Sequence, residues 1–391
     1  MNEFMRIGDI CNILNGYAFK SSKYVADGIR VIRITNVQKG FVEDTNPQYY
    51  PVSEQREIEK YMLCEGDLLM SLTGNVGRVG LLSAEMLPAA LNQRVACIRI
   101  RNPAVIYKPF LFHLLNSDYF ENKCILASQG VAQKNMSTEW LKEYPIPSFS
   151  MDKQMEIASI FDKIDDLIAR RKEQVRNMDQ AVKSRFIELF GDCDLTHPQE
   201  SWVTIKEIGS VVGGATPKTD HDEYWGGSYR WITPAELDAD SGYIYDSVRK
   251  LTKAGVESCS LQEMPVGTVI LSSRAPIGKV AIAGNTFYCN QGFKNIICKE
   301  GITPRYLYTV LLLNVEYLNS LGRGATFKEI SKGIVESIRI PVPSMELQEQ
   351  FAAFVEQTDK SKYYSSLSFR YCQAAANTYR QEWMTCRTSD F

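Results

Sequence analysis

Side chains that could carry catalysis or bind a metal are few and scattered in this sequence of 391 residues. The three histidines, His113, His197 and His221, form no H-E-x-x-H arrangement and have no cysteine at ligand spacing. The ten cysteines include no C-x-x-C pair. This spacing predicts no metal site carried by the chain, and it favours reduced thiols in the cytoplasm over a disulfide framework.

Two short motifs resemble known binding loops but lack a residue that each chemistry requires. Residues 238–242 resemble the start of a calcium loop, yet the twelfth position is Arg249 instead of a bidentate glutamate. Residues 273–279 match the end of a phosphate-binding Walker A loop, but Ser273 replaces its first glycine and Val280 replaces the hydroxyl that holds Mg²⁺. We therefore expect neither a calcium site nor a nucleotide site here.

Signatures of methyl transfer and of DNA cleavage are also missing. The sequence contains no Asn/Asp-Pro-Pro-Tyr/Phe tetrapeptide of the adenine-methyltransferase kind. Asp118, Glu121 and Lys123 give one isolated match to a nuclease set inside a predicted helix, and Gly322 and Gly324 favour a turn. We expect a chain without catalysis and without a cofactor of its own.

Polar and basic residues recur instead in loops at corresponding places of the two halves. Asn and Gln can pair bidentately with adenine and Arg with guanine, while Thr and glycine amides contact phosphate. Each residue alone has a structural alternative, because an asparagine can cap a turn, a lysine can be solvated and a tryptophan can fill a core. As a set they predict DNA contacts by Lys20, Arg33, Asn36, Thr73, Asn75, Arg78, Asn92, Gln93, Arg94 and Lys134 in the first half, and by Lys218, Arg230, Trp231, Ser273, Arg274, Lys279, Asn290, Gln291, Arg323 and Lys328 in the second.

These loops belong to a domain that occurs twice. Residues 128–165 align without a gap on residues 322–359, with identical residues 194 positions apart that include Gln154 and Gln348. Further upstream, residues 65–82 resemble residues 265–282 in their apolar pattern and turn glycines. A period of this length indicates a duplicated domain and not a solenoid.

Each copy is predicted to be a mixed α/β (α+β) domain that is rich in strands. Short β-branched or apolar runs bounded by Gly, Asn and Pro predict strands at 30–37, 67–72, 79–82 and 94–100, and again at 230–233, 268–272, 279–283 and 292–298. A leading proline and helical apolar spacing predict one helix in each copy, at 109–124 and 304–320. We expect four segments: a domain at 1–150, a helix at 151–195, a domain at 196–343 and a helix at 344–391.

Met151–Phe190 contains neither glycine nor proline and is predicted to be one long helix. Alternate steps of four and three give an apolar seam at coiled-coil spacing, broken by Arg171 and Arg185: Ile157, Phe161, Ile164, Ile168, Val175, Met178, Val182 and Leu189. Read alone, this pattern also fits an ordinary surface helix. The repeat supplies a partner, because the same positions 194 residues later include Phe351, Val355 and Phe369.

Connectivity favours an antiparallel pair of helices. At 1.5 Å per residue the first helix would be about 60 Å long, whereas a domain of this size has a diameter of about 40 Å. A parallel pair would require the second domain to span the whole first helix. The antiparallel pair predicts two similar domains at opposite ends of a rod, related by a pseudo-two-fold axis.

Overall composition restricts the class of protein less than the repeat does. The formal charge of −2 and the pI near 6.1 give no global nucleic-acid signature, so a DNA surface would depend on local clusters of Lys and Arg. No apolar run approaches the roughly 20 residues that a membrane span needs. We expect a soluble cytoplasmic protein that has no membrane partner.

The combination of these features resembles the specificity subunits of type I restriction-modification systems. The resemblance covers the whole chain and rests on the duplicated domain, GNVGRVG at 74–80, APIGKV at 275–280 and the Asn-Gln pairs at 92 and 290. It also includes the Ile-Pro junctions that lead through Gln154 and Gln348 into each long helix. It implies that each domain is a target recognition domain reading one half of a bipartite DNA sequence, with the helices as a spacer.

The same resemblance implies the partners and cofactors. A specificity subunit has no activity alone but positions two modification subunits, which carry S-adenosylmethionine and methylate adenine at N6. Two ATP-dependent restriction subunits join through them, so ATP and Mg²⁺ would also lie in partner subunits. Unlike loop residues, Thr73 to Asn75 against Arg274 to Pro276, predict two different half-sites and hence an asymmetric double-stranded target.

The second long helix departs from the pattern after Thr358. Three polar residues, Thr358, Lys362 and Ser365, follow one another at seam positions, and the end of the chain is rich in Ser, aromatic residues and Cys. This half could be frayed, altered or completed by self-association with another copy. Two alternative functions also stay open, namely a single-chain restriction or modification enzyme and a coiled-coil scaffold that reads no DNA.

Overall fold

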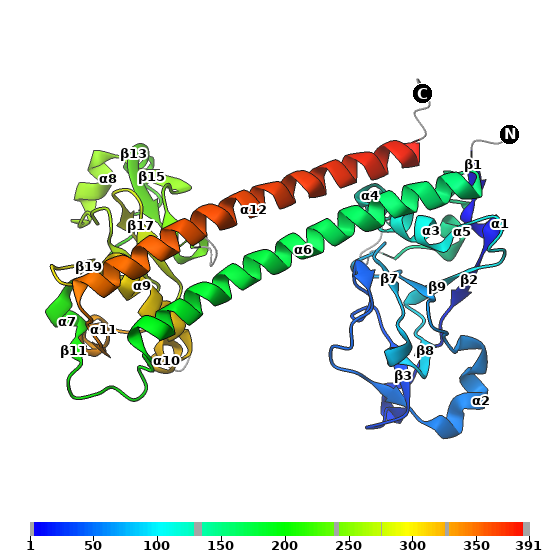
Figure 1. Ribbon diagram of the computed structural model, residues 1–391, viewed down its shortest axis with the longest axis horizontal. Coiled ribbons are helices and arrows are strands. Elements are labelled where there is room, and N and C mark those ends of the chain that lie inside the picture. The colour runs from blue at the N-terminus through cyan, green and yellow to red at the C-terminus, as the bar shows by residue number, and fades with distance from the viewer. Residues whose placement is uncertain (1–3, 129–134, 238–241, 275, 325–327, 386–391) are drawn as a thin grey trace. The chain divides into compact units, whose positions relative to one another are not determined.

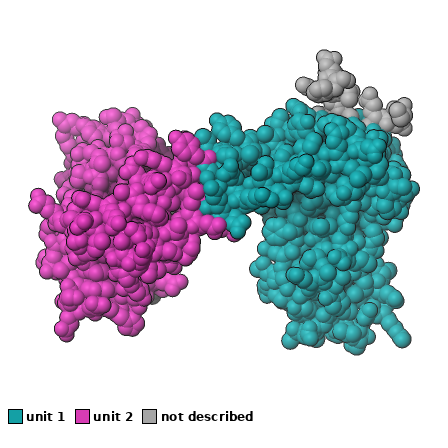
Figure 2. Space-filling model, in the orientation of Figure 1, with its two compact units in different colours: residues 1–174, 365–391 teal, residues 175–364 magenta. Residues whose placement is uncertain are grey.

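The chain forms two compact units, which are coloured separately in Figure 2. Unit 1 comprises Met1–Gln174 and Ser365–Phe391, and unit 2 comprises Val175–Tyr364. The computed structural model describes residues 4–128, 135–237, 242–274, 276–324 and 328–385, of which 384 and 385 are described as backbone only. Because the boundary between the units falls inside both long helices, each unit contains a part of each helix.

Unit 1 is built on a five-stranded, a three-stranded and a two-stranded sheet. The five-stranded sheet has the order β2 (Cys11–Asn15), β9 (Val95–Ile100), β6 (Leu68–Ser71), β7 (Val79–Leu81) and β4 (Gly40–Phe41), antiparallel except that β4 pairs parallel with β7. The three-stranded sheet has the order β5 (Tyr49–Tyr50), β3 (Ile29–Ile32) and β8 (Ala89–Leu91), with β3 and β8 parallel. The last sheet pairs β1 (Phe4–Arg6) with β10 (Pro145–Pro147).

Besides its parts of the long helices, unit 1 contains five shorter helices within the described residues. They are α1 (Ile7–Ile10), α2 (Gln55–Ile58), α3 (Lys108–Leu115), α4 (Asp118–Ala127) and α5 (Thr138–Glu143), with 3₁₀ turns η1 (Ser21–Lys23), η2 (Val52–Glu54), η3 (Glu59–Tyr61) and η4 (Ala84–Met86). Phe110 of α3 and Phe120 of α4 pack with Leu68 and Met70 of β6 in one buried cluster. This core fixes the strand ends from which the predicted DNA-contacting loops emerge.

Unit 2 repeats the sheets of unit 1 strand for strand. Its five-stranded sheet has the order β12 (Gly209–Gly213), β19 (Lys294–Cys298), β16 (Val269–Leu271), β17 (Val280–Ala283) and β14 (Tyr243–Ile244), and β14 is again parallel to its neighbour. The other sheets are β15 (Arg249–Leu251), β13 (Trp225–Ile232) and β18 (Tyr288–Cys289), and β11 (Val203–Thr204) with β20 (Arg339–Ile340). The duplicated mixed α/β domain predicted from the repeat is therefore confirmed.

The helices of unit 2 are α7 (Ile205–Ile208), α8 (Lys253–Ser258), α9 (Pro304–Leu313), α10 (Val315–Ser320) and α11 (Lys332–Ser337), with 3₁₀ turns η5 (Asp222–Tyr224) and η6 (Pro234–Glu236). The prediction of one helix at 109–124 and one at 304–320 is wrong, because each is two helices. Asn116 closes α3 and the Ser117 side chain accepts a hydrogen bond from the backbone N–H of Phe120 to begin α4. Asn314 marks the same break between α9 and α10.

The two long helices are α6 (Met151–Phe190) and α12 (Met345–Thr385), both uninterrupted in Figure 1. The predicted helix Met151–Phe190 is confirmed. Every predicted apolar seam position of α6 is buried or half-buried, whereas the intervening Arg171 is exposed. The α12 helix is regular beyond Thr358, so the open question of fraying is answered within the described residues.

In unit 1 the two helix segments pack in opposite directions. Arg380 of α12 donates to both carboxylate oxygens of Asp165 of α6 at 2.7 and 2.8 Å, and the Arg380 guanidinium lies 5.0 Å from the centre of the Phe161 ring. Lys172, further along α6, lies over the ring of Phe369, which comes earlier in α12. Arg380 of α12 thus has its ion-pair partner on α6 of the same chain.

In unit 2 the contact between the helix segments is aromatic. Phe186 is fully buried and its ring centre lies 5.4 Å from that of Phe351 and 5.7 Å from that of Tyr306. Lys362 forms an ion pair with Asp179, which precedes Phe186, so this pair is antiparallel as well. Phe186 is absent from the predicted seam because the helix turns this side toward the domain core, where Tyr306 of α9 lies.

Candidate nucleic-acid interface

Two of the predicted loops in unit 1 come together at the ends of β3 and β8. They line a pocket of about 320 Å³ formed by Arg33, Ile34, Thr35, Asn92, Gln93 and Arg94. A backbone bridge between Tyr17 and Asn92 adds the loop after β2. Gln93 and Arg94 are exposed at this pocket. Side chains that were selected from separate stretches of sequence therefore form one surface.

Two asparagines predicted to contact DNA form hydrogen bonds to the backbone of these loops. Asn36 is buried, accepts a hydrogen bond from the backbone N–H of Arg33 at 3.0 Å and donates to the carbonyl of Glu43 at 3.1 Å. Asn92 is buried and its side-chain oxygen accepts from the backbone N–H of Arg94 at 3.1 Å. We therefore assign both asparagines a structural role in place of the predicted base contact, since their polar atoms serve the backbone.

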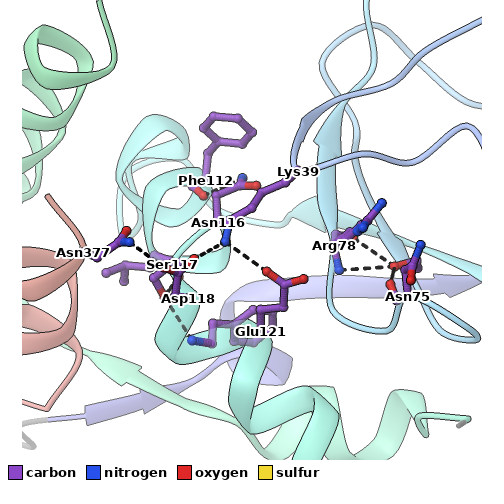
Figure 3. A network of polar contacts seen from close by, with 12 residues as sticks. Lys39, Asn75, Arg78, Phe112, Asn116, Ser117, Asp118, Glu121 and Asn377 are labelled. Carbon is purple, nitrogen blue, oxygen red and sulfur yellow. Dashed lines mark hydrogen bonds and ion pairs between the residues drawn. The ribbon is translucent and has the colours of Figure 1, made fainter. Parts of the chain in front are cut away.

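The turn between β6 and β7 presents Thr73 and Asn75 in unit 1. Gly77 closes this turn with φ +89, and an added Cβ would lie 2.8 Å from Cys124, so glycine is required there. Arg78 is half-buried and donates to the side-chain oxygen of Gln38 at 2.7 Å; Figure 3 shows it beside Asn75. The turn keeps Asn75 exposed while Arg78 braces the neighbouring loop.

Unit 2 builds the corresponding turn on the same backbone. Gly278 also has φ +89, and its added Cβ would lie 2.9 Å from Val315. Lys279, which corresponds to Arg78, donates to the carbonyls of Pro234 at 3.1 Å and Leu237 at 3.0 Å. The turn exposes Arg274 where unit 1 has Thr73.

Two further residues of unit 2 are buried instead of exposed to a ligand. Trp231 is 2 % exposed and its indole N–H donates to the carbonyl of Ala215 at 3.1 Å. Ser273 is fully buried, and its backbone N–H donates to the carbonyl of Gly292 at 2.7 Å. We correct the predicted DNA contact of both to a structural role, because water and nucleic acid do not reach these side chains.

The other half-buried residues also bind protein groups. Arg33 donates to the carbonyl of Asn46 at 2.6 Å, and Arg230 forms an ion pair with Asp246 at 3.1 Å. The side-chain oxygen of Asn290 accepts from the backbone N–H of Gly292 at 2.9 Å. The predicted DNA contacts of these three residues stay predictions.

Nine predicted residues are exposed and can approach a ligand without rearrangement: Lys20, Asn75, Gln93 and Arg94 in unit 1, and Lys218, Arg274, Gln291, Arg323 and Lys328 in unit 2. Thr73 is half-buried. Lys134 lies outside the described residues. The exposed set contains one glutamine and at least two basic residues in each unit.

Two loop residues that were not predicted to contact DNA lie directly opposite the turns. Asn135 pairs with Thr73 through a backbone bridge, and the Thr73 hydroxyl donates to the Asn135 side-chain oxygen at 2.8 Å. Glu329, 194 positions later, pairs with Arg274 through a backbone bridge and an ion pair of 3.0 Å. The gapless repeat contained this signal, because the two residues occupy the same aligned position and differ in charge.

A buried glutamine fastens each long helix to its domain. Gln154 accepts from the backbone N–H of Tyr107 at 2.8 Å and donates to the carbonyls of Val105 and Phe149. Gln348 makes the same three bonds, with the backbone N–H of Thr303 at 2.8 Å and two carbonyls at 3.0 Å. Both glutamines are fully buried. Both copies therefore have glutamine at this position because it connects the long helix to its domain, and we call this set of contacts the joint.

The residues that could suggest other chemistry have structural partners. Asp118 and Glu121 both bind Lys39, and Asp118 also accepts from Asn377 of α12 (Figure 3). Across the described parts of the chain, no three His, Cys, Asp or Glu side chains are grouped so that they could hold a metal ion. The two carboxylates of the isolated nuclease-type match in α4 thus form ion pairs with Lys39. The calcium-like stretch at 238–241 lies outside the described residues.

None of the helices, within the described residues, is both long and apolar enough to span a membrane.

Comparison with known proteins gives a consistent family. The family model for the type I restriction modification DNA specificity domain matches residues 2–177 and again residues 200–363. The specificity subunit of the type I restriction enzyme MjaIX of Methanocaldococcus jannaschii is 43% identical over 184 residues, which cover 46% of this chain and 42% of that protein. The putative MjaX specificity subunit of the same organism is 26% identical over 380 residues, 91% of this chain and 86% of the relative.

Solved structures agree in fold. A chain from a study of the assembly and conformational transition of a type I R-M system has a TM-score of 0.57 at 16% identity and covers 97% of both chains. The S subunit of a type I restriction-modification system from M. genitalium has a TM-score of 0.53 at 14% identity, covering 99% of this chain and 96% of that one. Both matches extend over both copies of the repeated domain.

Proposed function

Because the chain belongs to the type I restriction-modification DNA specificity family, we propose that it is the subunit that reads the DNA target of such a complex. Each unit reads one half of a bipartite double-stranded sequence. The exposed residues Gln93 and Arg94 in unit 1, and Arg274 and Gln291 in unit 2, supply the donors and acceptors that pair with base edges.

One observation carries this proposal, namely that the two units share a backbone and differ in loop chemistry. The same turn presents Thr73 opposite Asn135 in unit 1 and Arg274 opposite Glu329 in unit 2. An amide pairs bidentately with adenine and an arginine with guanine, so the two turns favour different bases. The two half-sites therefore differ, and the target is asymmetric.

The chemistry of methylation and cleavage lies in partner subunits. We infer two modification subunits that hold S-adenosylmethionine and methylate adenine, and two ATP- and Mg²⁺-dependent restriction subunits. Their DNA contacts supplement those of this chain, whose net charge of −2 is too low for strong non-specific binding. This chain contributes the sequence information and the surfaces that place the partners.

The direct test is methylome sequencing of the host with and without this chain. The proposal predicts that one bipartite adenine-methylation motif disappears on deletion and returns when the intact chain is restored. An unchanged methylome contradicts it. A second measurement distinguishes this proposal from the single-chain enzyme. Methyl transfer from S-adenosylmethionine by the purified chain alone would place catalysis in this chain.

A further inference from the structure

Glu329 lies at the centre of a cluster of basic side chains in unit 2. One carboxylate oxygen lies 3.0 Å from Nε of Arg274, and the other lies 3.2 Å from Nζ of Lys294. The backbones of Arg323 and Glu329 exchange two hydrogen bonds, of 3.1 and 3.0 Å. The N–H of Ile330 donates to the carbonyl of Ser273 at 2.9 Å. The backbone on both sides of Glu329 is therefore fixed, and so is the origin of its side chain.

The carboxylate of Glu329 is ionised at neutral pH. Partial burial opposes ionisation, but the bonds from Lys294 and Arg274 outweigh it, and the pKa lies below the ordinary value of a glutamate. A charged hydrogen bond of this kind is stronger than a neutral one and directional. It holds one edge of the Arg274 guanidinium in place.

The ion pair joins Nε of Arg274 to a carboxylate oxygen of Glu329 at 3.0 Å, and the terminal nitrogens of the guanidinium carry four further N–H donors. The side chain is 46% exposed. Two parallel N–H groups of a guanidinium match O6 and N7 of guanine in the major groove. A guanidinium that is already held in place loses less side-chain entropy when it binds. The neighbouring carboxylate also offsets the attraction of a free arginine to phosphate, which carries no sequence information.

We propose that Arg274 reads a guanine in the half-site of unit 2 and that Glu329 is the positioning residue that aims its guanidinium. This inference rests on the proposed function of the chain as a DNA reader. It goes further by assigning one base, guanine, to unit 2. It also names Glu329 as a residue that acts without touching DNA.

Unit 1 provides the internal comparison. Thr73, Asn135 and Ala96 stand at the positions of Arg274, Glu329 and Lys294, on the same bridge and the same strand register. The Thr73 hydroxyl binds Asn135 at 2.8 Å. None of these three residues carries a guanidinium, so the corresponding position of unit 1 lacks this contact to guanine.

The test measures the affinity of the full chain, assembled with its modification subunits, for duplexes that carry single base changes in the methylated target. In the wild type, replacing the guanine read by Arg274 lowers affinity about 5- to 150-fold, the range for a bidentate contact. E329Q, which keeps the size of the side chain and removes its charge, loses most of this discrimination at that position alone. The control K328A changes an exposed lysine that we expect on phosphate, and it weakens all duplexes by the same factor.

R274K is the second variant, because it keeps the positive charge and removes the fork, so the inference stays testable even if E329Q folds poorly. Relaxation of the same guanine position by R274K and E329Q, with the other half-site unchanged, supports the inference. Unchanged discrimination, or an equal loss of affinity for every duplex, overturns it while leaving the DNA-reading function intact. A wild-type complex that prefers no bipartite duplex overturns the proposed function itself, and the inference with it.

Discussion

Units 1 and 2 contain corresponding sheets but differ in the residues that their loops expose. The five-stranded sheets have the same strand order and the same parallel edge pair. The turns that follow β6 and β16 both need glycine with φ +89. These features depend on backbone hydrogen bonds and close packing, which are indifferent to the side chain at Thr73 or Arg274. A duplicated domain can therefore change what it reads without changing how it folds.

The long helices show the same contrast in their packing. Asp165 on α6 and Asp359 on α12 occupy one aligned position, and each binds an arginine: Arg380 of α12 in unit 1 and Arg305 of α9 in unit 2. Counting back 194 positions from Arg380 gives Phe186, which fills the core of unit 2. At this aligned position α12 therefore makes an ion pair in unit 1, whereas α6 makes aromatic contacts in unit 2.

The shared joint gives the largest predicted effect. Gln154→Leu and Gln348→Leu each leave one buried N–H and two carbonyls without their partner, at about 1–3 kcal/mol per group. We expect each variant to lose at least about 3 kcal/mol of unfolding free energy, by a similar amount in both units. Gln373→Leu, on the exposed side of α12, is the matched control and should change stability by less than about 0.5 kcal/mol. A large loss in one unit only would break the equivalence of the joints.

The unequal helix contacts give the next effect. Phe186→Ala should cost about 3–5 kcal/mol because it empties a closed core. Arg380→Ala should cost about 1–2 kcal/mol, since the Asp165 side chain that it leaves is 45% exposed and stays hydrated. Denaturant unfolding of both variants checks the order. Equal costs would mean that the ion pair in unit 1 packs as a core contact.

The smallest effect is a pH dependence specific to unit 1. His113 of α3 is buried against α6, where Asp162 and Asp165 face it, and Arg380 of α12 lies beside them. Burial lowers the pKa of His113, with Asp162 opposing. Because the folded pKa lies below the unfolded pKa of about 6.5, the stabilisation is present above that value and is lost as the pH falls through the folded pKa.

Thermal unfolding between about pH 5 and about pH 8 tests this dependence. The wild type should lose stability toward acid more steeply than H113Q, which cannot bind the proton. His197→Gln is the control, because that histidine is 85% exposed. Identical slopes for wild type and H113Q would contradict the assignment to His113.

Much of the scaffold follows from the sequence, because a gapless repeat and a helical period are properties of many residues at once. The start of α6 at Met151 and its apolar seam are examples, and so are the central strands of the two five-stranded sheets, whereas the helix segment predicted at 151–195 ends at Phe190. The breaks at Asn116 and Asn314 are not predictable from apolar spacing, since it continues across both helix pairs. In unit 1 the Ser117 side chain caps the start of α4, whereas Asn314 begins α10 without a side-chain cap.

The exposure of the candidate loop residues was predicted less completely, because residue type alone does not determine exposure. Asn36, Asn92 and Ser273 have side chains suited to a base or phosphate contact, yet the loops use them internally. Trp231 is buried by tertiary packing that no local pattern reveals. Glu329 was missed because an acidic residue does not suggest DNA binding until its arginine partner is located.

The central claim is that the two units read different halves of one target. Methylome sequencing of hosts that carry Arg94→Ala or Arg274→Ala in this chain tests it most directly. We predict that Arg94→Ala relaxes the methylated motif in one half only and Arg274→Ala relaxes it in the other half only, each by about 1–3 kcal/mol of discrimination. Relaxation of the same half by both variants, or an unchanged motif in both, would contradict the account.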